Sequence, residues 1–201
     1  MQGYLGGQTV KLQFEERRAY DVGVHPSKEP REVPEKLLYL LRHAKSSWDD
    51  PKLPDHDRPL NPRGLKAAKR MAQRMHRDNV SPALLLCSSA RRARETLAPI
   101  EQALSPAKIK VEDGLYAADA AQLLERLHRI APSVPSVMII GHNPGIQELA
   151  VQLVGDQEAR SRIASRFPTG SLAALSIRVP RWRGLAAAGV ELVEFMTPRD
   201  A

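Results

Sequence analysis

The chain has 201 residues, of which 42% are hydrophobic and 26% charged, and its formal net charge is +7. This length and hydrophobic content suit one domain of ordinary size and argue against wholesale disorder. No apolar stretch approaches the roughly 20 residues of a membrane-spanning helix, and the single cysteine, Cys87, excludes an intrachain disulfide framework. We therefore expect a soluble, cytoplasmic protein with no membrane partner.

The first 36 residues differ from the rest of the chain. They contain as many basic as acidic side chains, so the whole positive excess lies in residues 37–201. Glycine and proline are frequent here, and only a short amphipathic piece at 10–14 could pair as a strand. We expect a leader over 1–36 that is loosely packed or partly disordered, followed by a single domain over 37–201.

From residue 37 onward, apolar runs alternate with helical periodicities. The runs at 37–41, 83–87 and 137–140 are short and uninterrupted, as in strands that are buried on both faces. Helical spacing follows them at 65–75, 93–104, 123–130 and 146–153, and two further extended runs lie at 172–179 and 190–196. Strands that alternate with helices indicate an α/β fold with a sheet that is mostly parallel at its centre.

Two Asn-Pro pairs mark expected helix starts. Asn61 precedes Pro62, and Asn143 precedes Pro144. Asparagine is favoured at the N-cap and proline at the first helical position, so capping alone explains both asparagines.

Polar side chains follow each of the first three apolar runs. They are Arg42 and His43 after the first run, Ser88, Ser89, Arg91, Arg92 and Arg94 after the second, and His142 and Asn143 after the third. The carboxyl ends of parallel strands form the ligand-binding edge of such sheets, and helix N-termini favour anions. We expect these groups to converge on one crevice, with at most one or two of the three arginines after the second run pointing into it.

Several rival chemistries do not fit the spacing of the motifs. A cysteine phosphatase loop places an arginine six positions after its cysteine, but Ala93 stands there, so we expect Cys87 to be the buried end of a strand. The chain has no glycine-rich nucleotide loop. The acidic stretch 55–57 lacks paired histidines, so we expect a surface turn, no metal and no cofactor. With 4% aromatic residues, a nucleic-acid stacking platform is not expected.

Taken together, these residues resemble the histidine phosphatase superfamily, whose signature is an Arg-His pair after the first strand. The closer resemblance is to its SixA-like phosphohistidine phosphatases. The similar blocks follow the family's order, at 40–48, 55–64, 87–96, 141–145 and 168–171. The resemblance implies a phosphoglycerate-mutase-like fold, which is a three-layer α/β sandwich whose mostly parallel central sheet has helices on both faces.

The resemblance also implies roles for seven residues. They are His43 as the nucleophile, Arg42, Arg92 and His142 as the other catalytic residues, and Arg58, Asn61 and Asn143 as substrate-binding residues. A neutral imidazole is a competent nucleophile near pH 7. Phosphoryl transfer needs cations against the phosphoryl oxygens, which arginines supply without a metal.

The chain departs from the family pattern at the acidic residue that protonates the leaving oxygen in many relatives. Gly114 stands at that position, with Glu112 and Asp113 as poor substitutes. Because imidazole is a much less basic leaving group than an alkoxide, this departure favours a nitrogen–phosphorus bond in the substrate. We therefore expect a metal-independent phosphatase whose partner is a protein carrying phosphohistidine.

Three alternatives remain open at this point. The same scaffold could act on small phosphate monoesters. The crevice could bind phosphate or a polyanion without turnover, although a pure binder would not need His43. The basic domain could also bind nucleic acid, which a steep dependence on salt would reveal.

Overall fold

The computed structural model describes residues 35–105, 108–186 and 189–200. The predicted leader, including the possible strand at 10–14, lies outside these ranges except for its last two residues. The first strand begins at Glu35, and Lys36 donates hydrogen bonds to the carbonyl oxygens of Pro132 and Val134. These two residues are therefore part of the sheet.

The described residues form six strands and five α-helices, together with three short 3-10 helices. The strands are β1 (Glu35–Arg42), β2 (Leu84–Ser88), β3 (Ile109–Glu112), β4 (Ser136–Gly141), β5 (Leu172–Arg178) and β6 (Val190–Met196). The helices are α1 (Pro62–Arg77), α2 (Arg91–Leu104), α3 (Ala120–His128), α4 (Gly145–Leu153) and α5 (Gln157–Ser165). The 3-10 helices are η1 (Asp55–Asp57), η2 (Asp113–Leu115) and η3 (Trp182–Gly184).

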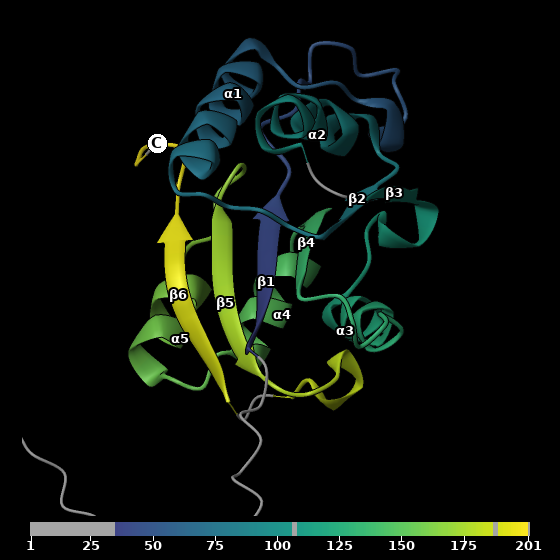
Figure 1. The fold of residues 1–201 in the computed structure, drawn as a ribbon. Helices are drawn as coiled ribbons and strands as arrows, with labels where there is room; N and C mark the ends of the chain where they lie inside the picture. Colours follow the sequence, from purple (N-terminus) through teal and green to yellow (C-terminus); the bar gives the residue numbers. More distant parts are fainter. Residues whose placement is uncertain (1–34, 106–107, 187–188, 201) are drawn as a thin grey trace, which may run out of the picture. The chain divides into compact units, whose positions relative to one another are not determined.

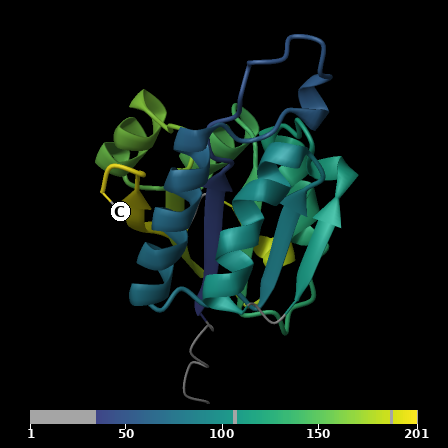
Figure 2. The same ribbon diagram turned by 90° about the horizontal axis from the view of Figure 1, so that it is seen from above.

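The six strands form one sheet in the order β3-β2-β4-β1-β5-β6. The pairings β2–β3, β2–β4 and β1–β4 are parallel, whereas β5 runs antiparallel to both β1 and β6. Helices α1 and α2 cover one face of the sheet, and α3, α4 and α5 lie on the other (Figures 1 and 2). The expected three-layer α/β fold with a mostly parallel central sheet is confirmed.

Strand β1 shows why the apolar runs are uninterrupted. Successive side chains of a strand point to opposite faces of the sheet. Leu38 and Leu40 belong to the hydrophobic cluster that packs against α3, α4 and α5, whereas Tyr39 and Leu41 belong to the cluster that packs against α1 and α2. Burying a leucine side chain contributes about 1.5–3 kcal/mol, so both faces of this strand favour apolar residues.

The two predicted helix caps have different outcomes. The side chain of Asn61 accepts a hydrogen bond of 2.8 Å from the amide of Gly64 and caps α1, as predicted. The prediction is wrong for Asn143. Helix α4 begins one residue later than predicted, with Pro144 at its N-cap and no side-chain cap, and Nδ2 of Asn143 donates to Gln147 Oε1 at 2.8 Å and to the carbonyl oxygen of Phe167 at 3.3 Å.

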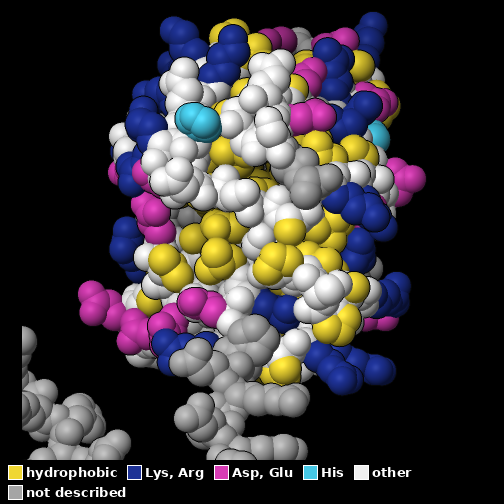
Figure 3. Space-filling model, in the orientation of Figure 1, with side chains coloured by type: hydrophobic (Ala, Val, Ile, Leu, Met, Phe, Trp, Pro, Cys, Tyr) yellow, Lys and Arg dark blue, Asp and Glu magenta, His cyan; other side chains and the backbone are white. Residues whose placement is uncertain are grey.

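The distribution of charged side chains on the surface and the hydrophobicity of the helices each bear on an expectation from the sequence. On the face drawn in Figure 3, Lys and Arg side chains lie mainly along the two sides, among Asp and Glu, while hydrophobic side chains occupy the middle. The charge excess therefore does not form a single basic surface on this face. Within residues 35–105, 108–186 and 189–200, no helix combines the length and hydrophobicity needed to span a bilayer.

Candidate active site

The two histidines meet because β1 and β4 are parallel neighbours. In this pairing Arg42 lies opposite Gly141, so the residues that follow, His43 and His142, leave the sheet side by side at its carboxyl edge. Neighbouring strands lie about 4.8 Å apart, and the centroids of the two imidazole rings are 5.0 Å apart. Residues almost 100 positions apart in the sequence thus share one site, as the strand-end pattern predicted.

The turn at 168–171 fixes the chain immediately after β1. Gly170 has φ +81°, in the left-handed region that glycine adopts without strain. Its amide donates to the carbonyl oxygens of Arg42 and His43, at 3.0 Å in each case. This contact sets the path of the backbone that carries the first histidine.

Strand β2 and helix α2 bring Ser88 and Arg92 to the same place. Nη2 of Arg92 lies 3.3 Å from Nδ1 of His142, and its Nε donates to Nε2 of His43 at 3.3 Å. Ser88 Oγ lies 2.7 Å from Nε2 of His142. Of the three arginines in the first turn of α2, Arg92 is buried, whereas Arg91 and Arg94 are exposed. This agrees with the expectation that at most two of them point inward.

The hydrogen bonds determine which nitrogen of each imidazole carries the proton. Nδ1 of His43 lies 2.7 Å from the carbonyl oxygen of Ala44, which can only accept, so Nδ1 is protonated and Nε2 presents its lone pair. A guanidinium can only donate, so Nδ1 of His142 accepts from Arg92. Nε2 of His142 therefore carries the proton and donates to Ser88 Oγ. Both rings are neutral in this arrangement.

Burial favours the same neutral state. Desolvation lowers the pKa of His43 to about 3, with the positive charges of Arg92 and Arg42 acting in the same direction. Burial is also the main reason that the pKa of His142 falls to about 4, and Arg92 adds to this effect. At neutral pH, Nε2 of His43 is therefore unprotonated, which is the state that a nucleophile needs.

Asp55 joins the site from η1, although the sequence analysis treated this segment only as a surface turn. Its carboxylate accepts hydrogen bonds from Arg92 Nη2 at 2.8 Å, Arg58 Nη1 at 3.1 Å and the hydroxyl of Tyr116 at 2.9 Å. Partial burial opposes ionisation, but the hydrogen bonds from Tyr116 and Arg92 hold the pKa of Asp55 below its ordinary value. The turn is exposed, as predicted, yet this carboxylate orients two of the arginines.

Arg58 is fixed by an aromatic ring on one face of its guanidinium plane and by hydrogen bonds at its edges. Its Cζ lies 3.1 Å from the centroid of the Trp48 ring. Its Nε and Nη2 donate to the carbonyl oxygen of Ser47 at 2.8 and 2.7 Å, and Nη2 also donates to Ser46 Oγ. Arg58 is 5% exposed despite its charge. Such restraint keeps the guanidinium in position before a ligand binds.

A cavity of about 450 Å³ opens at this edge of the sheet. Its lining residues are Arg42, His43, Lys45, Ser46, Trp48, Asp55, Arg58, Arg92 and Thr169. Four of the residues singled out from the sequence are in this set. His142 lies behind it and contacts His43 and Arg92, whereas Asn61 and Asn143 are not among the lining residues and use their side chains within the fold.

The sequence analysis missed two residues that shape the site, Asp55 and Tyr116. The ring of Tyr116 packs edge-on against His142, with 5.6 Å between the centroids. The acidic stretch in the second motif block was a usable signal for Asp55, since a carboxylate beside arginines can orient them. No sequence signal marked Tyr116, because its contacts depend on how η2 packs.

The acidic residues near Gly114 do not reach the histidines. Both carboxylate oxygens of Glu112 accept from Arg126, at 2.6 and 2.7 Å, and these hydrogen bonds lower its pKa. Asp113 is exposed at the start of η2. The described residues contain no group of three or more His, Cys, Asp or Glu side chains arranged to hold a metal ion.

Comparison with known proteins places this site in a family. A sequence profile of the histidine phosphatase superfamily (branch 1) matches residues 38–131. An uncharacterised protein of Mycobacterium leprae is 38% identical over 169 residues, which cover 79% of this chain and 100% of that protein.

Two solved structures resemble the chain over nearly their whole length. A candidate phosphohistidine phosphatase SixA from Agrobacterium tumefaciens is 32% identical, with a TM-score of 0.71 over 82% of this chain and 99% of that one. A second such candidate, from Nakamurella multipartitia, is 28% identical, with a TM-score of 0.73 over 83% and 98%. The chain therefore belongs to the histidine phosphatase superfamily, and within it to the SixA-like phosphatases.

Proposed function

We propose that the protein hydrolyses phosphohistidine in a partner protein by transferring the phosphoryl group to Nε2 of His43. The observation that carries this proposal is the hydrogen bond from Nδ1 of His43 to the carbonyl oxygen of Ala44, which leaves an unprotonated Nε2 in a cavity lined by three arginines. A neutral nucleophile beside several fixed cations is what attack on an anionic phosphoryl group requires.

The reaction proceeds in two steps. Nε2 of His43 attacks phosphorus while the bond from phosphorus to the substrate imidazole breaks, and the departing imidazole nitrogen takes up a proton from solvent. Water then attacks the phosphorylated His43, which releases inorganic phosphate and restores the free imidazole. Arg42, Arg58 and Arg92 bind the phosphoryl oxygens in both steps, where positive charge stabilises the transition state.

Arg92 has a further role, because it contacts both imidazoles in the free protein. Its Nε occupies the lone pair of His43 at 3.3 Å, a long hydrogen bond. We infer that the phosphoryl oxygens draw this guanidinium away and expose the lone pair. His142 and Asp55, which also bind Arg92, keep it within reach of the oxygens.

The carboxyl groups around the site favour phosphohistidine as the substrate. An alkyl phosphate releases an alkoxide, which needs a general acid, whereas imidazole leaves with less assistance. Hydrogen bonds keep Asp55 ionised, and Glu112 is paired with Arg126. Neither carboxyl is therefore suited to protonate a leaving oxygen at neutral pH. The two similar structures named as SixA candidates agree with this choice of substrate.

The test compares wild type with His43→Asn in an assay of phosphate release from a phosphohistidine peptide. We expect a loss of at least about 10³-fold in kcat/KM, because the variant lacks the nucleophile. His76→Asn is the matched control, since His76 is an exposed residue of α1 outside the cavity. Full activity of the His43→Asn variant would refute the proposed mechanism.

The same assay distinguishes the alternatives. A small-molecule phosphomonoesterase would show higher kcat/KM on an alkyl phosphate than on the phosphohistidine peptide. A binding module would retain phosphate analogues without releasing phosphate from any substrate.

A further inference from the structure

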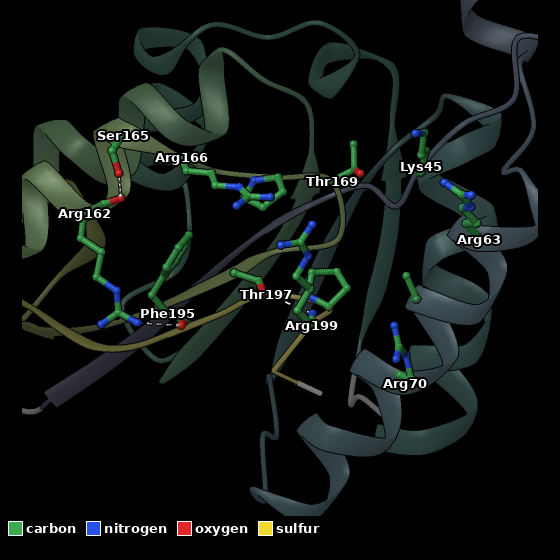
Figure 4. A pocket seen from close by; sticks show the side chains of 13 residues that line it. Lys45, Arg63, Arg70, Arg162, Ser165, Arg166, Thr169, Phe195, Thr197 and Arg199 are labelled. Carbon is green, nitrogen blue, oxygen red and sulfur yellow. Dashed lines mark hydrogen bonds between the residues drawn. The ribbon is translucent and has the colours of Figure 1, made fainter.

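A second hollow borders the active-site cavity. It has a volume of about 550 Å³ and shares Lys45 and Thr169 with that cavity. Figure 4 shows it between α1 on one side and α5 with the segment that follows it on the other. A ligand that fills the active-site cavity can thus extend directly into this hollow.

Six cationic side chains line this hollow, which we call the basic groove. They are Lys45, Arg63, Arg70, Arg162, Arg166 and Arg199. They come from four separate parts of the chain, namely the loop after β1, helix α1, the end of α5 and the C-terminal segment. In Figure 4 the side chains of Arg166 and Arg199 reach toward the middle of the groove. The cations therefore converge from several elements and are not the outer face of a single helix.

The charge of the groove is not balanced by its own lining. No Asp or Glu is among the lining residues. Across the described ranges, none of the six cations forms an ion pair, although eight arginine–carboxylate pairs are present elsewhere. Like charges in proximity repel one another, so an anionic ligand would relieve a cost that the free protein bears.

The length of the groove favours an extended anion. Arg63 and Arg70 are seven residues apart on α1, which corresponds to about 10 Å along the helix axis. A single phosphate contacts two or three cations, whereas a groove of this length can bind several carboxylates spaced along a peptide ligand. Phe195, Pro168 and Pro198 supply apolar surface between the cations, against which a peptide backbone and the stems of acidic side chains can pack.

The depth of the nucleophile points to the same kind of ligand. His43 is 8% exposed, so a phosphorylated side chain must enter the cavity while its flanking residues lie across the rim. On the side of Lys45 and Thr169, that rim continues into the basic groove. We propose that the basic groove binds a carboxylate-rich segment next to the phosphohistidine of a protein substrate. This inference rests on the proposed function.

The test uses two synthetic phosphohistidine peptides. One has three glutamates on each side of the phosphohistidine, and the other has glutamines at the same positions. At low salt we expect wild type to prefer the acidic peptide by about tenfold in kcat/KM. We expect Arg63→Ala/Arg70→Ala to reduce this ratio about fivefold to tenfold, as the loss of two exposed ion pairs predicts. High salt should reduce the wild-type ratio in the same direction.

A matched control separates the groove from the general charge of α1. Lys69→Ala/Arg77→Ala removes two cations from the same helix that line other hollows, and it should retain the wild-type ratio. Far-UV circular dichroism and thermal melting serve to check that both double variants are folded.

The outcomes distinguish a failure of this inference from a failure of the proposed function. Absence of phosphate release from both peptides by wild type would remove the proposed function. Phosphate release from both peptides at equal rates would overturn the assignment of a carboxylate-rich ligand to the basic groove and leave the proposed function intact. A preference for the acidic peptide that is undiminished in Arg63→Ala/Arg70→Ala would have the same consequence. A third outcome is equal rates on the two peptides together with inhibition by inorganic triphosphate that is lost in Arg63→Ala/Arg70→Ala. This outcome would assign the groove to a small phosphate compound and would also overturn the inference.

Discussion

The two buried imidazoles make the stability of the domain depend on pH in the range from 7 to 5. In the folded protein, the pKa is about 3 for His43 and about 4 for His142, chiefly because of burial. In the unfolded chain, both return to about 6.5. As the pH falls through 6.5, the unfolded chain binds two protons that the folded protein does not accept. The contribution of these groups to stability is present above pH 6.5 and is lost as the pH falls toward 4.

The magnitude follows from this difference in proton binding. At pH 5, protonation of each imidazole stabilises the unfolded chain by about 2 kcal/mol, and the two together by about 4 kcal/mol. Because both folded pKa values lie below 5, this figure depends almost entirely on the unfolded value. It is a large part of the 5–15 kcal/mol, roughly, that stabilises a typical domain.

The assay is urea unfolding at pH 7 and pH 5, followed by far-UV circular dichroism, for wild type and for His43→Gln/His142→Gln. The remaining titratable groups are common to both proteins, so the comparison isolates the two imidazoles. Between pH 7 and pH 5, wild type should lose about 4 kcal/mol more free energy of unfolding than the double variant. Equal losses in the two proteins would refute the conclusion that these rings are buried in the neutral state.

Three further predictions concern the arrangement of the site and its supports. Arg92→Lys should lower kcat/KM about 100-fold, measured by phosphate release, because an ammonium cannot contact both imidazoles and the phosphoryl group as the planar guanidinium does; a loss below threefold would contradict this role. Gly145→Ala should lower the melting temperature by several degrees, since the added Cβ would lie 2.0 Å from the carbonyl oxygen of Ala118. Gly184→Ala is its control, because a Cβ there meets no atom within 4 Å, and equal melting temperatures of the two variants would count against the close packing at Gly145. Cys87→Ala should retain kcat within about twofold, because burial raises the pKa of this thiol to about 12, and a loss comparable to that of His43→Asn would point to a cysteine nucleophile.

Much of the fold could be predicted because the buried strands carry an unambiguous signal. β1, β2 and β4 are interior strands of the parallel part of the sheet, and each is an apolar run that ends at polar residues. The elements that were missed have weak signals. β3 is a four-residue edge strand with no fully buried side chain, and α5 buries only Ile163. A segment that buries so little leaves no hydrophobic period in the sequence.

The same limit applies to the site. The convergence of His43, His142 and Arg92 could be predicted because parallel strands place their carboxyl ends at one edge. The part played by Asp55 could not, since it depends on a turn that folds back over the cavity. The cap predicted at Asn143 fails because α4 begins one residue later, and the side chain of Asn143 is held by a tertiary contact with the carbonyl oxygen of Phe167 as well as by Gln147 one turn along. Local rules do not contain such contacts.

The central claim is that the phosphoryl group passes through Nε2 of His43. The most direct measurement mixes the enzyme with a phosphohistidine peptide, stops the reaction within a turnover in alkali, which preserves phosphohistidine, and maps the phosphorylated residue by mass spectrometry. We predict a phosphoryl group on the enzyme peptide that contains His43, at a level that rises and then falls during turnover and is absent from His43→Asn. Phosphate release without any phosphorylation of His43, or phosphorylation at His142 in its place, would contradict the account.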